Sequence, residues 1–179
     1  MGIDWEIDET WTLFLDRDGV INERIMGGYV TEINQFLFKE KVVDSLSELS
    51  KKFGHVFVVT NQQGVSLGKM SEKQLNEIHE FMISEITVNG GIISKVYAAI
   101  ELKNELSEMR KPKPKMALLA QNEFPGIDFE KSVMVGDTDS DIRFGKNLGM
   151  KTVLILTEEK TSEKADIVVH SLFELNNMI

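Results

Sequence analysis

The chain has 179 residues, 42% of them hydrophobic, so it is long enough for one compact domain with a substantial core. Its formal net charge of −9 argues against broad binding to nucleic acid, and the absence of cysteine excludes disulfides and thiolate metal sites. The acidic stretch 1–10 is expected to be an N-terminal extension and not a secretory signal. No apolar run approaches membrane-spanning length, so we expect a cytoplasmic protein that does not bind membranes.

Apolar runs and amphipathic segments alternate along the chain, and the spacing of their apolar residues predicts strands and helices in turn. This alternation predicts an α/β fold of the Rossmann-like type, with a parallel sheet and helices on both faces. The charged stretch 101–115 fits neither period and is predicted to be a functional loop. In chain order we expect strand 11–15, helix 41–52, strand 55–59, helix 71–88, strand 92–100, helix 115–121, strand 132–135, helix 140–148, strand 152–156, strand 166–169 and helix 172–178.

Two acidic residues, Asp16 and Asp18, directly follow the first predicted strand, and Gly19 ends it. Residues two apart on a strand point the same way, so both carboxylates would project from the strand's carboxyl end, where open α/β sheets bind ligands. Such a pair suits a metal ion together with acid–base chemistry. A solvated turn is the alternative, while the remaining ligands of a calcium loop are missing.

Other polar groups follow the remaining predicted strands. Thr60-Asn61-Gln62 ends the second, the third leads to Arg110-Lys111-Pro112, and Gly136-Asp137 ends the fourth. Because the carboxyl ends of parallel strands share one edge, these segments should gather acids, a hydroxyl, an amide and cations around one crevice.

Six segments of the chain carry a resemblance to a known family. They are 16–22 (DRDGVIN), 28–30 (GYV), 60–65 (TNQQGV), 68–69 (GK), 110–112 (RKP) and 135–137 (VGD). With these motifs the chain resembles the haloacid dehalogenase-like (HAD) phosphatases over nearly its whole length. Within them it is most similar to the branch of the heptose bisphosphate and histidinol-phosphate phosphatases. No insertion between the motifs is large enough for a cap domain, so we expect one domain over 1–179. The resemblance implies a small-molecule phosphate ester as partner, and we expect a monomer or small homo-oligomer.

The resemblance also implies a mechanism. Asp16 would attack the phosphoryl group, and Asp18 would protonate the leaving oxygen and then activate water. Mg²⁺ would bind the Asp16 and Asp137 carboxylates and the Asp18 backbone carbonyl. Thr60 would offer its hydroxyl to the phosphate, and Lys111 would neutralise charge on the nucleophile and the phosphoryl group.

Substrate contacts follow from the same motifs. The Asn61 backbone N–H would hold a phosphate oxygen, with Gln62 beside it, and Arg110 would clasp a hydroxyl or a second phosphate. Gly28 and Tyr29 would contact the substrate from a short gate over 24–29. The Gly27-Gly28 pair could let this gate move, or could form a plain turn.

Two assignments stay open at this level. Lys113 competes with Lys111 for the role at the nucleophile, because both lie in the segment RKPKP. Asp141 could steady the metal's water ligands or Lys111, or it could simply complement the dipole of a helix that Asp139 caps.

The chain departs from its branch before the RKP motif. The usual zinc loop needs cysteine and histidine ligands, whereas this chain has Ser107, Glu108 and Met109 there, so no zinc is expected. We expect packing of Leu102, Leu106 and Met109 to hold the loop instead.

The expected reaction is hydrolysis of a sugar phosphate, first a heptose 1,7-bisphosphate at its 7-phosphate and second histidinol phosphate. Phosphotransfer, carbon–halogen cleavage and a non-catalytic binding module are the alternatives on this fold. The acid at Asp18 favours phosphoryl chemistry, because a leaving alkoxide needs a proton and a halide does not.

Overall fold

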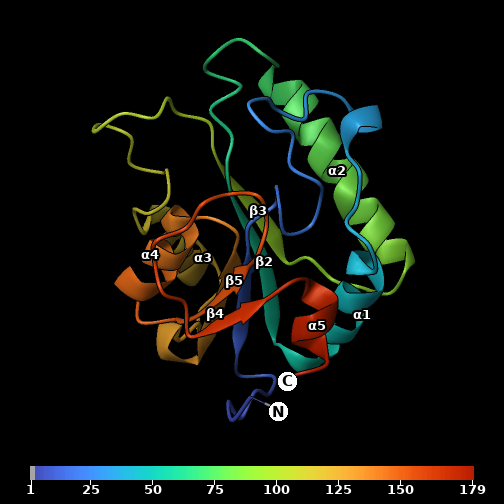
Figure 1. The fold of residues 1–179 in the computed structure, drawn as a ribbon, viewed down its shortest axis with the longest axis vertical. Coiled ribbons are helices and arrows are strands. Elements are labelled where there is room, and N and C mark those ends of the chain that lie inside the picture. The colour runs from blue at the N-terminus through green and yellow to red at the C-terminus, as the bar shows by residue number, and fades with distance from the viewer. Residues whose placement is uncertain (1–2) are drawn as a thin grey trace.

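The computed structural model describes residues 3–179, so the first two residues of the expected N-terminal extension lie outside it. Its centre is a sheet of six parallel strands in the order β3-β2-β1-β4-β5-β6 (Figure 1). The strands are β1 (Thr12–Leu15), β2 (His55–Asn61), β3 (Lys95–Ala99), β4 (Ser132–Gly136), β5 (Lys151–Ile155) and β6 (Ile167–Val169). This is the α/β architecture that the alternating pattern predicts.

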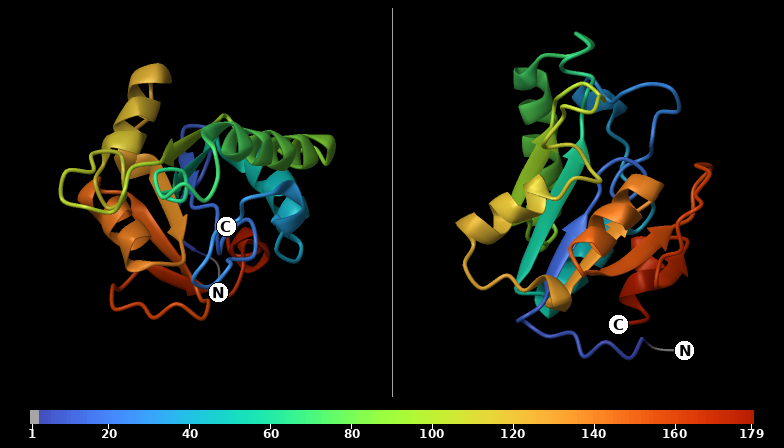
Figure 2. Two further views of the ribbon diagram at one scale, coloured as in Figure 1. Left: turned by 90° about the horizontal axis from the view of Figure 1, so that it is seen from above. Right: turned by 90° about the vertical axis from the view of Figure 1, so that its left-hand side faces the viewer.

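Within residues 3–179, five α-helices cover the two faces of the sheet. Figures 1 and 2 show α1 (Val42–Lys52), α2 (Glu72–Val88) and α5 (Leu172–Asn176) on one face, and α3 (Lys115–Glu123) and α4 (Asp139–Asn147) on the other. Alternate residues of β1 point to opposite faces, so each face has its own core. Leu13 and Leu15 pack in the core under α1, and Phe14 packs in the core under α3 and α4.

Every strand and helix expected from the sequence is present, with ends that differ by a few residues. The Ser71 hydroxyl caps α2 by accepting from the Gln74 backbone, and the Gln74 side chain accepts in return from the Ser71 backbone. Residues 100–114 contain no helix or strand, as predicted for the loop. Two short 3₁₀ turns, Ile33–Gln35 and Phe129–Lys131, have too few residues for a periodic signal and were not predicted.

The N-terminal segment 3–10 has no helix or strand and lies beside the C-terminus at the lower end of Figure 1. The Ile3 backbone donates a hydrogen bond to the Met178 carbonyl (2.9 Å), and Ile3 and Ile7 pack against the core. Among residues 3–179, no helix has the length and apolar character needed to cross a membrane.

The chain leaves β1 toward β2 on one side of the sheet and later returns to β4 on the other side of β1. The carboxyl ends of β1 and β4 therefore form a topological switch point, the usual ligand site of an open α/β sheet. The ladder continues past β1, because the Asp16 backbone N–H donates to the Val135 carbonyl at 2.9 Å.

Candidate active site

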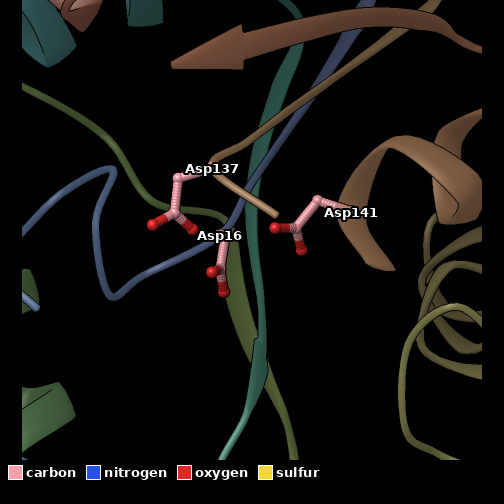
Figure 3. A group of neighbouring side chains, drawn as sticks. All are labelled: Asp16, Asp137 and Asp141. Atoms are coloured by element: carbon pink, nitrogen blue, oxygen red, sulfur yellow. The ribbon is translucent and has the colours of Figure 1, made fainter. Parts of the chain in front are cut away.

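Three buried carboxylates converge at the switch point. Asp16 follows β1, Asp137 follows β4, and Asp141 lies in the first turn of α4. Figure 3 shows the carboxylates of Asp16 and Asp137 side by side, with Asp141 reaching toward them from its helix. One oxygen from each of the three lies within 4.8 Å of the others. The sequence placed these residues at one sheet edge, and the structure brings them together.

Two glycines make this approach possible. A Cβ on Gly136 would lie 2.0 Å from the Asp141 Cβ, so any side chain there would push α4 away. Gly19 has a φ of +90°, and a Cβ on it would lie 2.1 Å from Asp137 Oδ2. Both positions need glycine, because backbone passes directly against a site carboxylate.

Lys111 is buried and bridges two of the three carboxylates. Its ammonium contacts Asp16 Oδ1 at 2.8 Å, Asp141 Oδ1 at 2.6 Å and the Val59 carbonyl at 2.6 Å. Burial lowers the pKa of Lys111, but the two carboxylates outweigh burial and hold the pKa above its ordinary value. Lys113 instead donates to the Glu105 carbonyl at 2.9 Å on the outside of the loop. The geometry therefore puts Lys111, and not Lys113, beside the nucleophile candidate.

Asn61 fixes the backbone that carries Lys111. The Lys111 backbone N–H donates to Asn61 Oδ1 at 3.0 Å, so the end of β2 is tied to the loop before α3. The side chain of Asn61 thus has a structural task in addition to the substrate contact expected of its backbone.

Asp141 both accepts hydrogen bonds at the start of α4 and pairs with Lys111, so it combines two roles that the sequence gave as alternatives. Its Oδ2 accepts from the Thr138 backbone N–H (3.0 Å) and hydroxyl (2.6 Å), while its Oδ1 pairs with Lys111. Thr138 is the N-cap of α4, so the alternative in which Asp139 caps this helix is wrong. Asp139 is the first helical residue, and its carboxylate accepts from the backbone of Ser162 instead.

Three neighbouring side chains hold the Asp18 carboxylate. Arg17 Nη2 donates to both of its oxygens (3.0 and 2.9 Å), Asn22 Nδ2 to one (2.9 Å) and Gln62 Nε2 to the other (2.7 Å). Burial raises the pKa of Asp18, but Arg17 and these hydrogen bonds outweigh burial and lower the pKa below its ordinary value. Asp18 is one of the residues that line the cavity described below, and its backbone carbonyl accepts from Arg24, which also binds Asp137.

Arg17 is fully buried and contacts His79 as well as Asp18. Its Nη1 lies 3.1 Å from His79 Nε2, and its guanidinium carbon lies 5.8 Å from the centre of the Phe36 ring. Burial and the Arg17 charge lower the pKa of His79 to about 3. A neutral His79 can accept a hydrogen bond from Arg17, so α2 supports the group that holds Asp18.

Arg24 is a site residue that the sequence did not identify as one. Its guanidinium donates to Asp137 Oδ1 (2.7 Å) and Oδ2 (3.0 Å) and to the Asp18 carbonyl (2.9 Å). It also lies 3.7 Å from Asp16 Oδ2. No local signal marked this residue, because its partner Asp137 is 113 positions away.

A cavity of about 500 Å³ opens above the cluster. Seven of the expected site residues line it, namely Asp16, Asp18, Gly28, Tyr29, Asn61, Arg110 and Lys111, and so does Asp141, whose role the sequence left open. Thr60, Gln62 and Asp137 are not among the lining residues. Thr60 is buried, and its hydroxyl accepts from Gln62 at 2.9 Å. Because Thr60 only accepts in this contact, its hydroxyl proton stays available for the expected hydrogen bond to a phosphate, although the residue does not line the cavity.

The loop 100–114 is held by polar contacts and not by the packing that the sequence suggested. Leu102 and Leu106 are 41% and 86% exposed, so that expectation is wrong for both, whereas Met109 does pack against the core. Glu101 Oε2 accepts from the Ser107 hydroxyl and from the Met109 backbone N–H (3.2 Å). One carboxylate thus ties the two ends of the loop together.

Gln63 joins this loop to the gate. It donates to the Tyr29 hydroxyl at 3.0 Å and accepts from the Lys103 backbone N–H at 3.0 Å. The wall of the cavity is therefore one connected set of three segments. Three further cations on this wall were not predicted from the sequence: Lys103, Arg143 and Lys160.

Comparison with known proteins agrees with this geometry. A family model for HAD-hydrolase-like proteins matches residues 108–175. The D-glycero-beta-D-manno-heptose-1,7-bisphosphate 7-phosphatase of Yersinia pestis is 35% identical, over 93% of this chain and 94% of its own. The D-glycero-alpha-D-manno-heptose-1,7-bisphosphate 7-phosphatase of Burkholderia mallei is 37% identical, over 86% of this chain and 83% of its own. The chain belongs to the HAD-like phosphatases, in the branch of the heptose bisphosphate phosphatases.

Solved structures show the same HAD-like fold. D,D-heptose 1,7-bisphosphate phosphatase from B. bronchiseptica, complexed with magnesium and phosphate, superposes with a TM-score of 0.82 at 21% identity. The match covers 93% of this chain and 96% of that one. A putative HAD-like phosphatase from Mesorhizobium loti superposes with a TM-score of 0.76 at 22% identity, over 99% and 90% of the two chains.

The oxygen atoms of this HAD-like site fit a hard divalent cation. All its candidate ligands are oxygens: the Asp16, Asp137 and Asp141 carboxylates and the Asp18 carbonyl. Burial raises the pKa of Asp16, with Lys111 only partly opposing it. Burial and Asp16 raise the pKa of Asp137 to about 7, although Arg24 opposes the shift. A cation at this point would hold both groups ionised, so the electrostatics and the donor set favour Mg²⁺.

Proposed function

We propose that this protein is a Mg²⁺-dependent phosphatase that forms an aspartyl-phosphate on Asp16 and hydrolyses a heptose 1,7-bisphosphate at its 7-phosphate. One observation carries the proposal: the Asp16 carboxylate lines a cavity between the buried ammonium of Lys111 and the carboxylate of Asp137. This places a nucleophile, a fixed positive charge and candidate metal ligands together at one point.

In the first step an Asp16 oxygen attacks phosphorus, and the bond to the sugar oxygen breaks. Asp18 gives its proton to that oxygen, and the sugar leaves as an alcohol. In the second step Asp18 takes a proton from water, the water attacks the phosphoryl group, and the Asp16 carboxylate is released with inorganic phosphate. Lys111 offsets negative charge at Asp16 throughout, and a bound Mg²⁺ would supply charge neutralisation for the phosphoryl oxygens.

The donors around Asp18 favour its carboxylate form, which is the form that activates water. The acid form needed in the first step must therefore be reached with substrate bound. A dianionic phosphate brought close to Asp18 raises the pKa of a neighbouring carboxylate, because like charges disfavour ionisation. Substrate binding thus favours the protonation state that the first step requires.

A bisphosphate fits the cations of the cavity wall. Arg110 lines the cavity and, among residues 3–179, its buried Nη1 has no hydrogen-bond partner. Lys103 lies on the same wall. A second phosphate could satisfy Arg110 bidentately while the first is held at Asp16. The two heptose bisphosphatases compared above differ in anomer, so both anomers are candidate substrates.

Phosphate release from α- and β-heptose 1,7-bisphosphate, sugar monophosphates and histidinol phosphate, with Mg²⁺, tests the proposal. We expect the heptose bisphosphates to give the highest kcat/KM, with loss of the 7-phosphate alone. Preference for histidinol phosphate would move the chain to the other enzyme of its branch. No release from any ester would favour a non-catalytic module.

An Asp16→Asn variant is the control for the nucleophile. Removing a nucleophile from a catalytic set typically costs at least about 10⁴-fold in kcat, so turnover should collapse while circular dichroism stays that of a folded protein. Unchanged turnover would end the assignment of Asp16.

A further inference from the structure

The guanidinium of Arg24 binds the same oxygens that the proposed function gives to a metal ion. It donates to both oxygens of Asp137 and to the Asp18 carbonyl, and it lies 3.7 Å from Asp16 Oδ2. These three groups are the expected Mg²⁺ ligands. A guanidinium and a metal ion cannot share the same lone pairs at bonding distance, and two cations at one point repel each other.

We propose that Arg24 competes with the divalent metal ion for Asp16, Asp18 and Asp137, and so weakens the chain's affinity for that metal. The inference rests on the proposed function only in taking these groups as the metal site. It concerns a property of this chain's own residue, and metal binding can be measured without turnover.

The strength of the Arg24 contacts makes the competition matter. Bidentate arginine–carboxylate pairs are among the stronger hydrogen-bonded contacts in proteins, and this one includes a fully buried carboxylate. A metal ion must displace the guanidinium before it can coordinate Asp137. Its apparent affinity is then reduced by the fraction of molecules in which Arg24 holds the site.

Only the side chain of Arg24 needs to move. The loop is anchored just before it, because the Glu23 backbone N–H donates to the Leu37 carbonyl at 2.8 Å and Asn22 is bridged to Phe38. The Arg24 side chain is 26% exposed, so one of its sides is open to solvent. Displacement therefore requires a change of rotamer and not a rearrangement of the fold.

The structure offers a second position for the guanidinium. A second hollow, of about 270 Å³, is also lined by Arg24, and its other lining residues include Glu23, Lys39 and Glu158. Lys39 already pairs with Glu23 at 3.6 Å, so Glu158 is the carboxylate that can receive the guanidinium when a metal ion takes Asp137. Arg24 would thus alternate between Asp137 and this second hollow, and the metal ion would select the second position.

Direct metal binding to the full chain tests the inference. Mn²⁺ would be titrated and followed by electron paramagnetic resonance, and Mg²⁺ by calorimetry, in the absence of any phosphate ester. If Arg24 holds the site in about nine molecules of ten, Arg24→Gln should bind either metal about tenfold more tightly than the parent. Arg24→Lys should fall between them, because an ammonium cannot reproduce the fork of a guanidinium.

A matched control separates competition from the loss of a positive charge. Lys160 lines the same cavity and, among the described residues, forms no hydrogen bond or ion pair with Asp16, Asp18 or Asp137. Lys160→Gln should change metal affinity by less than about threefold, the size of a screened through-space effect.

Equal affinity in the parent and Arg24→Gln would overturn the inference, as would an equal gain in Lys160→Gln. If Arg24→Gln fails to fold without metal, the comparison of Arg24→Lys with the parent decides. If every variant binds the metal ion with the same affinity, competition by Arg24 is contradicted but the proposed function is not. A parent and variants that bind no metal at all count against the proposed metal site as well.

Discussion

The active site has two parts that the chain builds in different ways, a floor and a rim. The floor consists of Asp16, Lys111, Asp137 and Asp141, all buried, and three of them follow or contact the ends of central strands. The rim consists of the loops 23–31 and 100–114, which contain exposed residues such as Met26 and Leu106. The floor is held by ion pairs between buried groups, whereas the rim is held by single hydrogen bonds between loops.

From this difference we expect the floor to determine the chemical step and the rim to determine which substrate binds. Changes in the floor leave a buried charge without a partner, so they should affect both turnover and stability. Changes in the rim disturb contacts that water can replace, so they should affect substrate binding more than turnover. The predictions below test this division, beginning with the largest expected effect.

Asp18 adjoins both parts, since its backbone carbonyl shares the Arg24 guanidinium with Asp137 of the floor, and the residue lines the cavity. Replacing it by Asn removes the proposed acid and base, which is typically worth about 10²- to 10⁴-fold in rate. We expect the larger loss with alkyl phosphates, whose leaving oxygen needs a proton. With nitrophenyl phosphate, whose leaving group is stable as an anion, the loss should be smaller. Equal losses with both substrates would argue against the acid role.

Substitutions of Lys111 and Lys113 can be compared directly, because Lys111 belongs to the floor and Lys113 lies outside it on the same loop. Lys111→Ala leaves Asp16 and Asp141 buried without their cation, which should cost about 3–5 kcal/mol of unfolding free energy. The lost charge at the nucleophile should lower kcat by about 10²- to 10³-fold. Lys113→Ala should stay within about 0.5 kcal/mol of the parent in stability. Denaturant unfolding and steady-state kinetics on both variants make the measurement, and similar effects in the two would contradict the geometry.

The sequence predicted the floor better than the rim for a physical reason. Asp16 and Asp137 are fixed by strand periodicity and by the common edge of parallel strands, so local pattern was sufficient. The sequence could not decide between Lys111 and Lys113, because both lie in an irregular loop where no helical or strand periodicity fixes the direction of a side chain. Arg24 was missed because its role depends on where a side chain reaches in three dimensions, across 113 residues.

The contacts within the rim could not be predicted from the sequence either. Apolar residues in 100–114 suggested packing, yet Leu106 is 86% exposed, and the Glu101 carboxylate holds the loop. A hydrogen bond from a backbone N–H depends on the path of the loop, which composition does not determine.

Glu101→Ala tests whether the rim acts through substrate binding. It removes the acceptor for the Ser107 hydroxyl and the Met109 backbone N–H, so the segment that leads to Arg110 should loosen. Losing one or two such hydrogen bonds corresponds to about a 2- to 10-fold rise in KM, with kcat nearly unchanged. Leu106→Ala, at an exposed position of the same loop, should leave both constants as they are. A fall in kcat equal to the rise in KM would show that the loop also shapes the floor.

His79 supports the site from α2, and it should make the stability of the fold depend on pH. The pKa of His79 is about 3 in the folded chain because of burial and Arg17, against about 6.5 in an unfolded chain. Below pH 6.5 the unfolded chain takes up a proton that the folded chain refuses. The unfolding free energy should therefore fall by about 1.4 kcal/mol per pH unit well below pH 6.5, and His79 should contribute no slope above it.

His79→Gln keeps an acceptor for Arg17 but cannot titrate, so its unfolding free energy should fall less steeply with acid than that of the parent. Urea unfolding between pH 4.5 and 7.5 measures this difference, with His170→Gln at an exposed position as the control. The two curves should converge toward pH 4.5, because the parent loses an advantage that the variant never had. Parallel curves over the whole range would mean that the folded chain does not resist protonation of His79, so His79 would not be the neutral acceptor that holds Arg17 against Asp18.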